Sequence, residues 1–172
     1  MQQILSYFWQ ICLFRAGPEK IPKSIPVTVA LLGIYFILDS IHIYFRSSLS
    51  FFEMLAAIII GIGIETAFLF GLLVFKTVSQ RFLSTLCGLL GSNSILLAIL
   101  LPIHLVAIGM GDGLVADFLN ALWIVCFFWW LAIVGFILHR AAEISIMQGA
   151  MLALMIELLV FAMTSTFFSP GV

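Results

Sequence analysis

The segment FEMLAAIIIGIGIETAFLFGLLVF, residues 52–75, decides the fold class of this chain. After its first turn, Glu65 is the only charged residue that it contains. An α-helix of about 20 residues crosses the roughly 30 Å of hydrocarbon in a bilayer. The segment therefore predicts a transmembrane helix.

Segments of the same kind occur on both sides of this one, which predicts five transmembrane helices in all. We expect the others at residues 27–45, 93–111, 115–138 and 146–168. Of the 172 residues, 64% are hydrophobic and 9% are charged, whereas a soluble domain is about half apolar and about a quarter charged. The links between the spans are short. The expected fold is all-α, a polytopic membrane helix bundle that forms a single domain over residues 1–172.

Residues 1–16 predict an N-terminal helix that ends near Ala16, with three uncharged polar residues on one stripe, namely Gln3, Ser6 and Gln10. This layout favours a helix that lies in the membrane interface. Because the stripe carries no charge, docking on the bundle is the alternative. Residues 17–26 form a basic collar that its prolines keep extended, and residues 169–172 form a tail.

The apolar run of residues 82–111 is too long for one crossing, since at 1.5 Å per residue it would measure about 45 Å. The sequence GSNS at 91–94 combines a glycine with side chains that prefer turns. We therefore predict an interfacial lead-in over residues 82–90, followed by a third span that starts near Ser92. Pro102 should bend this span.

The basic residues predict the orientation of the chain. If it crosses five times, all but Arg46 of its seven lysines and arginines fall on one side. Basic loops stay in the cytoplasm, so the N-terminus should be cytoplasmic and the C-terminus external.

Three stretches resemble the Yip-domain family of five-span membrane proteins. They are FRAGPEKIPKS (14–24), similar to the start of short bacterial relatives, RFLSTLCGLLGSNSILLAILLPIHLVAIGM (81–110) and LWIVCFFWWLAIVGFILHRAAEISIMQGAMLALMIELL (122–159). The second joins a glycine-containing segment to a proline-bearing span, and the third joins a tryptophan-rich span to one with small residues. The resemblance implies five spans, a cytoplasmic N-terminus and a trafficking-type role, and its similarity to bacterial relatives implies a bacterial inner (cytoplasmic) membrane with the C-terminus on the periplasmic side.

Ionisable residues inside spans are candidates for function, because each costs a few kcal/mol to insert. The candidates are Asp39, His42, Glu65, His104 and Glu157. Asp39 and His42 share a helix face with Arg46, which predicts a ladder of local contacts near the membrane interface. His104 is expected to be packed and hydrogen-bonded, within reach of either glutamate.

Glu65 and Glu157 follow small residues at four-residue spacing, namely Ala57 and Gly61 in one span and Gly149 and Ala153 in the other. Small residues let helices approach closely, so both faces should be buried. If the two spans pack together, the carboxyls could relay protons or bind a cation. The alternative is a neutral carboxyl that is hydrogen-bonded to Thr66, Ser92 or Asn93.

We expect no enzyme, cofactor or metal site, because the sequence holds no catalytic, nucleotide-binding or metal-binding motif. The net charge of -1 gives no reason to expect nucleic acid. The aromatic run of residues 127–130 should face lipid or a partner. One function is a non-enzymatic scaffold, trafficking-type or accessory subunit in the lipid bilayer that binds another membrane protein or its own copy. The alternative is a small oligomeric transporter or channel that couples to protons or cations through its mid-membrane carboxylates.

Overall fold

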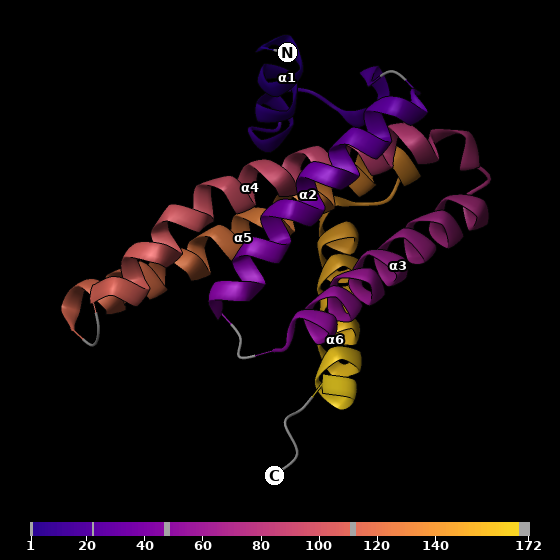
Figure 1. Ribbon diagram of the computed structural model, residues 1–172. Helices are drawn as coiled ribbons and strands as arrows, with labels where there is room; N and C mark the ends of the chain where they lie inside the picture. The colour runs from indigo at the N-terminus through magenta and orange to yellow at the C-terminus, as the bar shows by residue number, and fades with distance from the viewer. Residues whose placement is uncertain (1, 22, 47–48, 111–112, 169–172) are drawn as a thin grey trace.

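The computed structural model describes residues 2–21, 23–46, 49–110 and 113–168, and these residues form helices and connecting turns with no strand among them. The α-helices are α1 (Gln2–Cys12), α2 (Ile25–Arg46), α3 (Phe51–Phe75), α4 (Phe82–Met110), α5 (Leu114–Ala142) and α6 (Ile146–Phe168) (Figure 1). Short 3₁₀ turns follow α1 and α3, at Pro18–Lys20 and Ser79–Arg81. The five helices from α2 to α6 are long and apolar enough to cross a membrane. The predicted all-α bundle with five spans is confirmed.

The predicted span boundaries agree with α2, α3, α5 and α6 to within a few residues, and α6 coincides with residues 146–168. The first span starts slightly earlier than predicted, because Pro26 fits in the first turn of α2, where no helical hydrogen bond is lost. The predicted end of the third span at Gly111 and the tail at 169–172 lie outside the described residues.

α4 is continuous from Phe82 to Met110, so the predicted turn at 91–94 and the separate lead-in at 82–90 are wrong. The hydroxyls of Ser92 and Ser94 donate hydrogen bonds of 2.7 Å to carbonyls one turn back, at Gly88 and Leu90. They therefore bond within the helix instead of ending it. Gly91 lies against the ring of Phe8, with no room for a Cβ. Gly91 is therefore part of the surface on which α1 packs.

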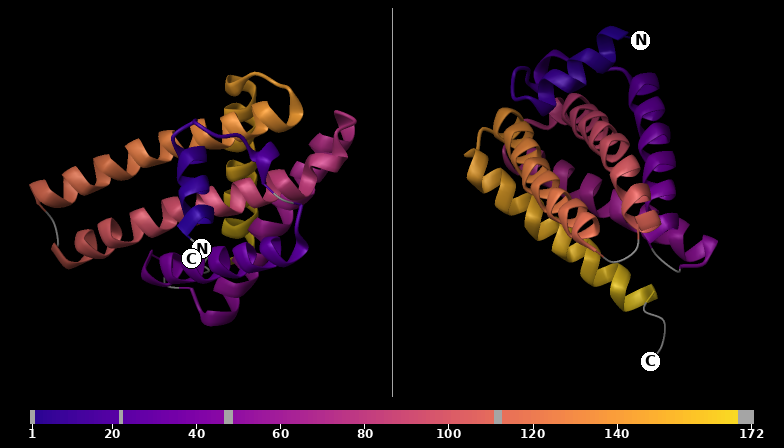
Figure 2. Two further views of the ribbon diagram at one scale, coloured as in Figure 1. Left: turned by 90° about the horizontal axis from the view of Figure 1, so that it is seen from above. Right: turned by 90° about the vertical axis from the view of Figure 1, so that its left-hand side faces the viewer.

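α1 ends at Cys12 and not near Ala16, because Phe14 adopts a left-handed conformation with φ of 60°. The Arg15 amide then donates to the Gln10 carbonyl at 2.8 Å and closes the helix end. Phe8, Ile11 and Cys12 are buried in a cluster with residues of α4 and α5. Trp129 of α5 donates a hydrogen bond of 3.0 Å to the Cys12 carbonyl. For this helix the structure shows the docked alternative (Figure 2).

The collar and two interhelical links meet at one end of the bundle. Arg140 forms an ion pair with Glu19 of the collar. Arg81 pairs with Glu143 at 2.9 Å and donates to the Ala141 carbonyl at 3.1 Å. The collar, the α3–α4 link and the α5–α6 link therefore share one end, which we call the collar end, as five crossings require.

The Glu19–Arg140 pair predicts a small dependence of stability on pH. The hydrogen bond from Arg140 lowers the pKa of Glu19 below its ordinary value of 4.5. A carboxyl whose pKa falls on folding stabilises the protein fully at pH values above its ordinary pKa. This contribution is lost as the pH falls through the lowered pKa. The Glu19 side chain is 40% exposed, so solvent screening limits the effect.

We expect Glu19→Gln to lower the free energy of unfolding by a few tenths of a kcal/mol at neutral pH. Melting of wild type and variant in detergent, followed from neutral pH to about pH 3, should show the two curves converging as the carboxyl takes up its proton. A difference that stays constant over this range would contradict the prediction.

Candidate functional site

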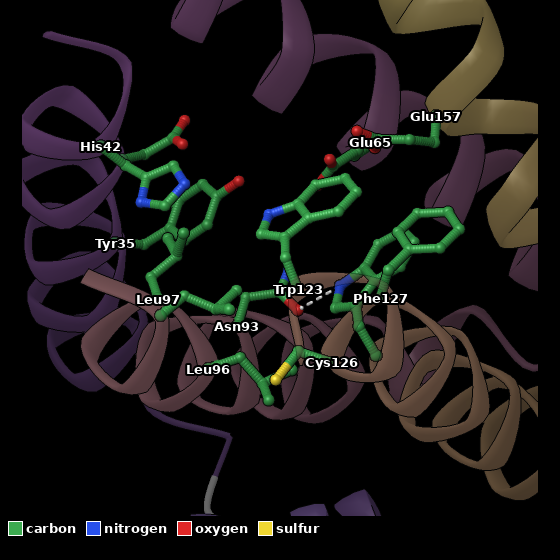
Figure 3. A pocket seen from close by; sticks show the side chains of 13 residues that line it. Tyr35, His42, Glu65, Asn93, Leu96, Leu97, Trp123, Cys126, Phe127 and Glu157 are labelled. Carbon is green, nitrogen blue, oxygen red and sulfur yellow. Dashed lines mark hydrogen bonds between the residues drawn. The ribbon is translucent and has the colours of Figure 1, made fainter. Parts of the chain in front are cut away.

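Side chains from all five spans surround a cavity of about 190 Å³ inside the bundle (Figure 3). A second cavity of about 310 Å³ adjoins it, between α2, α3 and α6. The two cavities share five residues, which we call the polar cluster: Tyr35, Asp39, His42, Glu65 and Glu157. The cluster therefore brings together four of the five ionisable residues that the sequence singled out.

α2 supplies three members of the cluster because Tyr35, Asp39 and His42 recur at helical spacing on one face. Asp39 lies on the cavity wall together with Glu65, and not only in a ladder along its own helix. The side chain of Arg46, the third member of the predicted ladder, lies outside the part of the chain that the structure describes. The His42 side chain is buried at 7% exposure.

His104 does not line either cavity of the polar cluster. Its ring packs against that of His42, with centroids 5.0 Å apart and planes tilted by 36°. Its Nε2 atom is buried and has no hydrogen-bond partner among the described residues. It also borders a separate hollow between α4 and α5, lined in part by Trp123. His104 thus contacts the cluster through His42.

Glu65 and Glu157 reach the same cavity because α3 and α6 pack closely. Gly61, one turn before Glu65, faces Val160, and a Cβ placed on Gly61 would lie 3.4 Å from Val160 Cγ1. Figure 3 shows the two glutamates together above Trp123, with Tyr35 and His42 across the cavity. The condition that the sequence left open, that these two spans pack together, is met.

The four small residues predicted at helix contacts are all buried, namely Ala57, Gly61, Gly149 and Ala153. Gly149, however, faces α5 and not α3. A Cβ placed on Gly149 would lie 2.7 Å from the carbonyl oxygen of Gly135. Sequence reasoning missed Gly135, although it is the one glycine in α5.

The aromatic residues of α5 form one wall of the cavity. Trp123, Phe127 and Trp130 recur at helical spacing and stack, with Phe127 5.9 Å from the first ring and 5.8 Å from the second. Trp130 also donates a hydrogen bond of 3.0 Å to Asn93 Oδ1. In the run that was predicted to face lipid or a partner, Phe128 is 63% exposed. Phe127 and Trp130 face inward.

Sequence reasoning also missed Tyr35 and Trp123 as site residues, and it named Asn93 only as a possible hydrogen-bond partner of a glutamate. A signal existed for Tyr35, which precedes Asp39 by one turn on the same face of α2. A signal also existed for Trp123, which lies at helical spacing from Phe127 and Trp130 on α5. Asn93 gave no such signal, because its neighbours GSNS suggested a turn.

The electrostatics of the site are dominated by carboxyl groups. Asp39, Glu65 and Glu157 line the second cavity, and no lysine or arginine is among the described residues that line either one. Carboxylates this close in a low-dielectric interior cannot all be ionised without a balancing charge. Protons on the carboxyls, a protonated His42 imidazole or a bound cation can supply that balance. No group of three His, Cys, Asp or Glu side chains within the described ranges is arranged to hold a metal ion.

Comparison with protein-family models, with curated proteins and with solved structures finds no match for this chain.

Proposed function

We propose that this chain is a non-enzymatic membrane protein that accepts protons or a small cation at the polar cluster, and that its oligomer is a carrier or channel for them. The observation that supports this most directly is the convergence of Asp39, Glu65 and Glu157, from three different spans, on adjoining cavities. A carboxyl inside a membrane costs a few kcal/mol, and here three of them line cavities that they share with His42, while no lysine or arginine is among the described lining residues. This favours the carrier over the scaffold.

The size and walls of the cavities fit such a ligand. A volume of about 190 Å³ holds several water molecules, each of which occupies about 30 Å³ in the liquid, so protons could move along hydrogen-bonded water. Tyr35, Trp123 and Phe127 add aromatic surface. Aromatic faces attract cations, and this attraction strengthens where water is excluded.

Flux measurements on purified protein in liposomes test the proposal. With a pH-sensitive dye inside, an imposed proton or methylammonium gradient should collapse through the wild type. The Glu65→Gln/Glu157→Gln double variant should slow the collapse at least tenfold, because an amide cannot take up and release a proton.

Asp117→Asn is the matched control for this experiment, because Asp117 is exposed in the first turn of α5 and lines neither cavity. It should behave as wild type. If vesicles with wild-type protein retain both gradients for as long as protein-free liposomes do, the carrier proposal is refuted.

The scaffold function is the second candidate, and the outer face of α6 favours it. Met147, Met151 and Met155 recur at four-residue spacing with exposures of 72%, 59% and 64%. Flexible methionine side chains adapt well to a partner surface. The Yip-domain resemblance also favours a partner-binding role. Co-purification of a stoichiometric partner that is lost from Met151→Ala/Met155→Ala, but not from the double glutamine variant, would support this function.

We also propose that the collar end faces the cytoplasm of a bacterial cell, with the chain in the inner membrane and the C-terminus external. The clustering of basic residues at that end supports this orientation. Reporter fusions after Ser79 should score as cytoplasmic, and an external score there would reverse the orientation.

A further inference from the structure

An apolar groove of about 1100 Å³ runs between α2 and α3, with α4 as its floor. Thr28 and Thr66 are the only polar side chains among the described residues that line it. On the floor, Leu90 is 4% exposed, whereas Val29 and Ile59 on the rims are 61% and 63% exposed. The groove is therefore a lateral opening on the outside of the bundle, separate from the polar cluster.

The groove extends over about half of the membrane thickness. It follows residues 28–37 of α2 and residues 59–70 of α3, which rise about 14 and 17 Å at 1.5 Å per residue. The hydrocarbon core measures about 30 Å, so this length matches one leaflet. Because Thr28 lies near the start of α2 and Phe70 near the end of α3, that leaflet is the one at the collar end.

Two glycines keep the groove open. A Cβ placed on Gly33 of α2 or on Gly63 of α3 would meet no heavy atom within 4 Å. No described side chain fills the space beside them. A bulkier residue at either position would occupy the groove without a clash.

Two lysines lie just beyond the groove-lining residues, at the collar-end termini of α2 and α3. α2 and α3 diverge toward the collar end (Figure 1), where Lys23 precedes the start of α2 and Lys76 caps the end of α3. Both lysines are exposed, and neither forms a salt bridge with any described residue. Arg81 and Arg140 at the same end are each paired with a glutamate. Positive charge is therefore available where the groove opens.

We propose that the groove binds an acyl chain of an anionic phospholipid from the leaflet at the collar end, with the lipid phosphate held by Lys23 and Lys76. The apolar walls match the chain, and basic residues next to a membrane attract anionic headgroups. A zwitterionic lipid with the same chains would fill the groove but would gain less from the lysines. This site is independent of the polar cluster and of any flux through it.

Native mass spectrometry of the full-length protein, purified in detergent and mixed with phosphatidylglycerol or phosphatidylcholine of identical chains, tests the proposal. The wild type should retain phosphatidylglycerol preferentially. Lys23→Gln/Lys76→Gln should reduce that preference about 25-fold, from about fivefold for each of the two charges removed. The control Arg15→Gln/Lys20→Gln removes the same charge from the segment that joins α1 to α2 and should leave the preference within about twofold.

Filling the groove provides a second test. Gly33→Leu/Gly63→Leu should reduce the retention of both lipids, whereas Gly71→Leu, at another open position on α3 outside the groove, should not. Equal retention of the two lipids by wild type, or equal effects of the two charge variants, would overturn the proposal. If filling the groove instead converts a dimer to a monomer and leaves lipid retention unchanged, the occupant is a second copy of the chain and the lipid assignment is wrong.

Discussion

Replacing Gly135 with leucine should prevent α5 from packing on α6 and leave little folded protein. A Cβ placed on Gly135 would lie 2.6 Å from the Ile146 carbonyl oxygen and 2.9 Å from the Ala150 amide nitrogen. Both are backbone atoms, so relief requires a shift of the whole helix. Overpacking of a close contact costs about 1–3 kcal/mol, and a branched side chain between two backbones should reach the upper end or exceed it.

The yield of the Gly135→Leu variant, its size-exclusion profile in detergent and its melting temperature measure this effect. Gly71→Leu is the control, because a Cβ placed there meets no heavy atom within 4 Å. It should fold as wild type does. Normal elution and melting of Gly135→Leu would mean that α5 and α6 do not touch at Gly135 and Gly149.

Replacing Gly91 with leucine should release α1 from the bundle and expose Cys12 to thiol reagents. The new side chain would occupy the place of the Phe8 ring, which packs on Gly91 of α4, and Phe8 is 3% exposed. Cys12 is fully buried, and burial raises the pKa of its thiol from 9.0 to about 11. Two pKa units reduce the reactive thiolate about 100-fold at neutral pH.

Maleimide labelling in a background without the other two cysteines, Cys87→Ser/Cys126→Ser, measures the release of α1. We expect Gly91→Leu to raise the labelling rate of Cys12 at least 100-fold, since both access and thiolate fraction recover. Gly109→Leu, at an open position on the same helix, should not change it. Equal labelling of Cys12 in the Gly91→Leu variant and in its parent would show that α1 is not held at Gly91.

The sequence predicted the spans well because the length of an apolar segment is a local property. The bounds of α6 follow from that length alone, whatever the helix packs against. It failed at residues 91–94 because turn propensity is also local, whereas the surface that these residues offer to α1 depends on a segment more than 70 residues away. The same distinction applies to the site. The spacing of Tyr35, Asp39 and His42 is visible in α2, but which helices their face meets depends on how α3 and α6 are rotated.

The docking of α1 has a consequence for the order in which the chain assembles. The bond from Trp129 to the Cys12 carbonyl joins residues 117 positions apart, and the rest of the contact surface lies on α4 and α5. Membrane proteins are synthesised from the N-terminus, so α1 leaves the ribosome before the residues that hold it exist. Phe8 can be covered only after α4 has been made, and the bond to the Cys12 carbonyl can form only after α5 has been made. α1 therefore precedes both helices in synthesis but reaches its final position only after them.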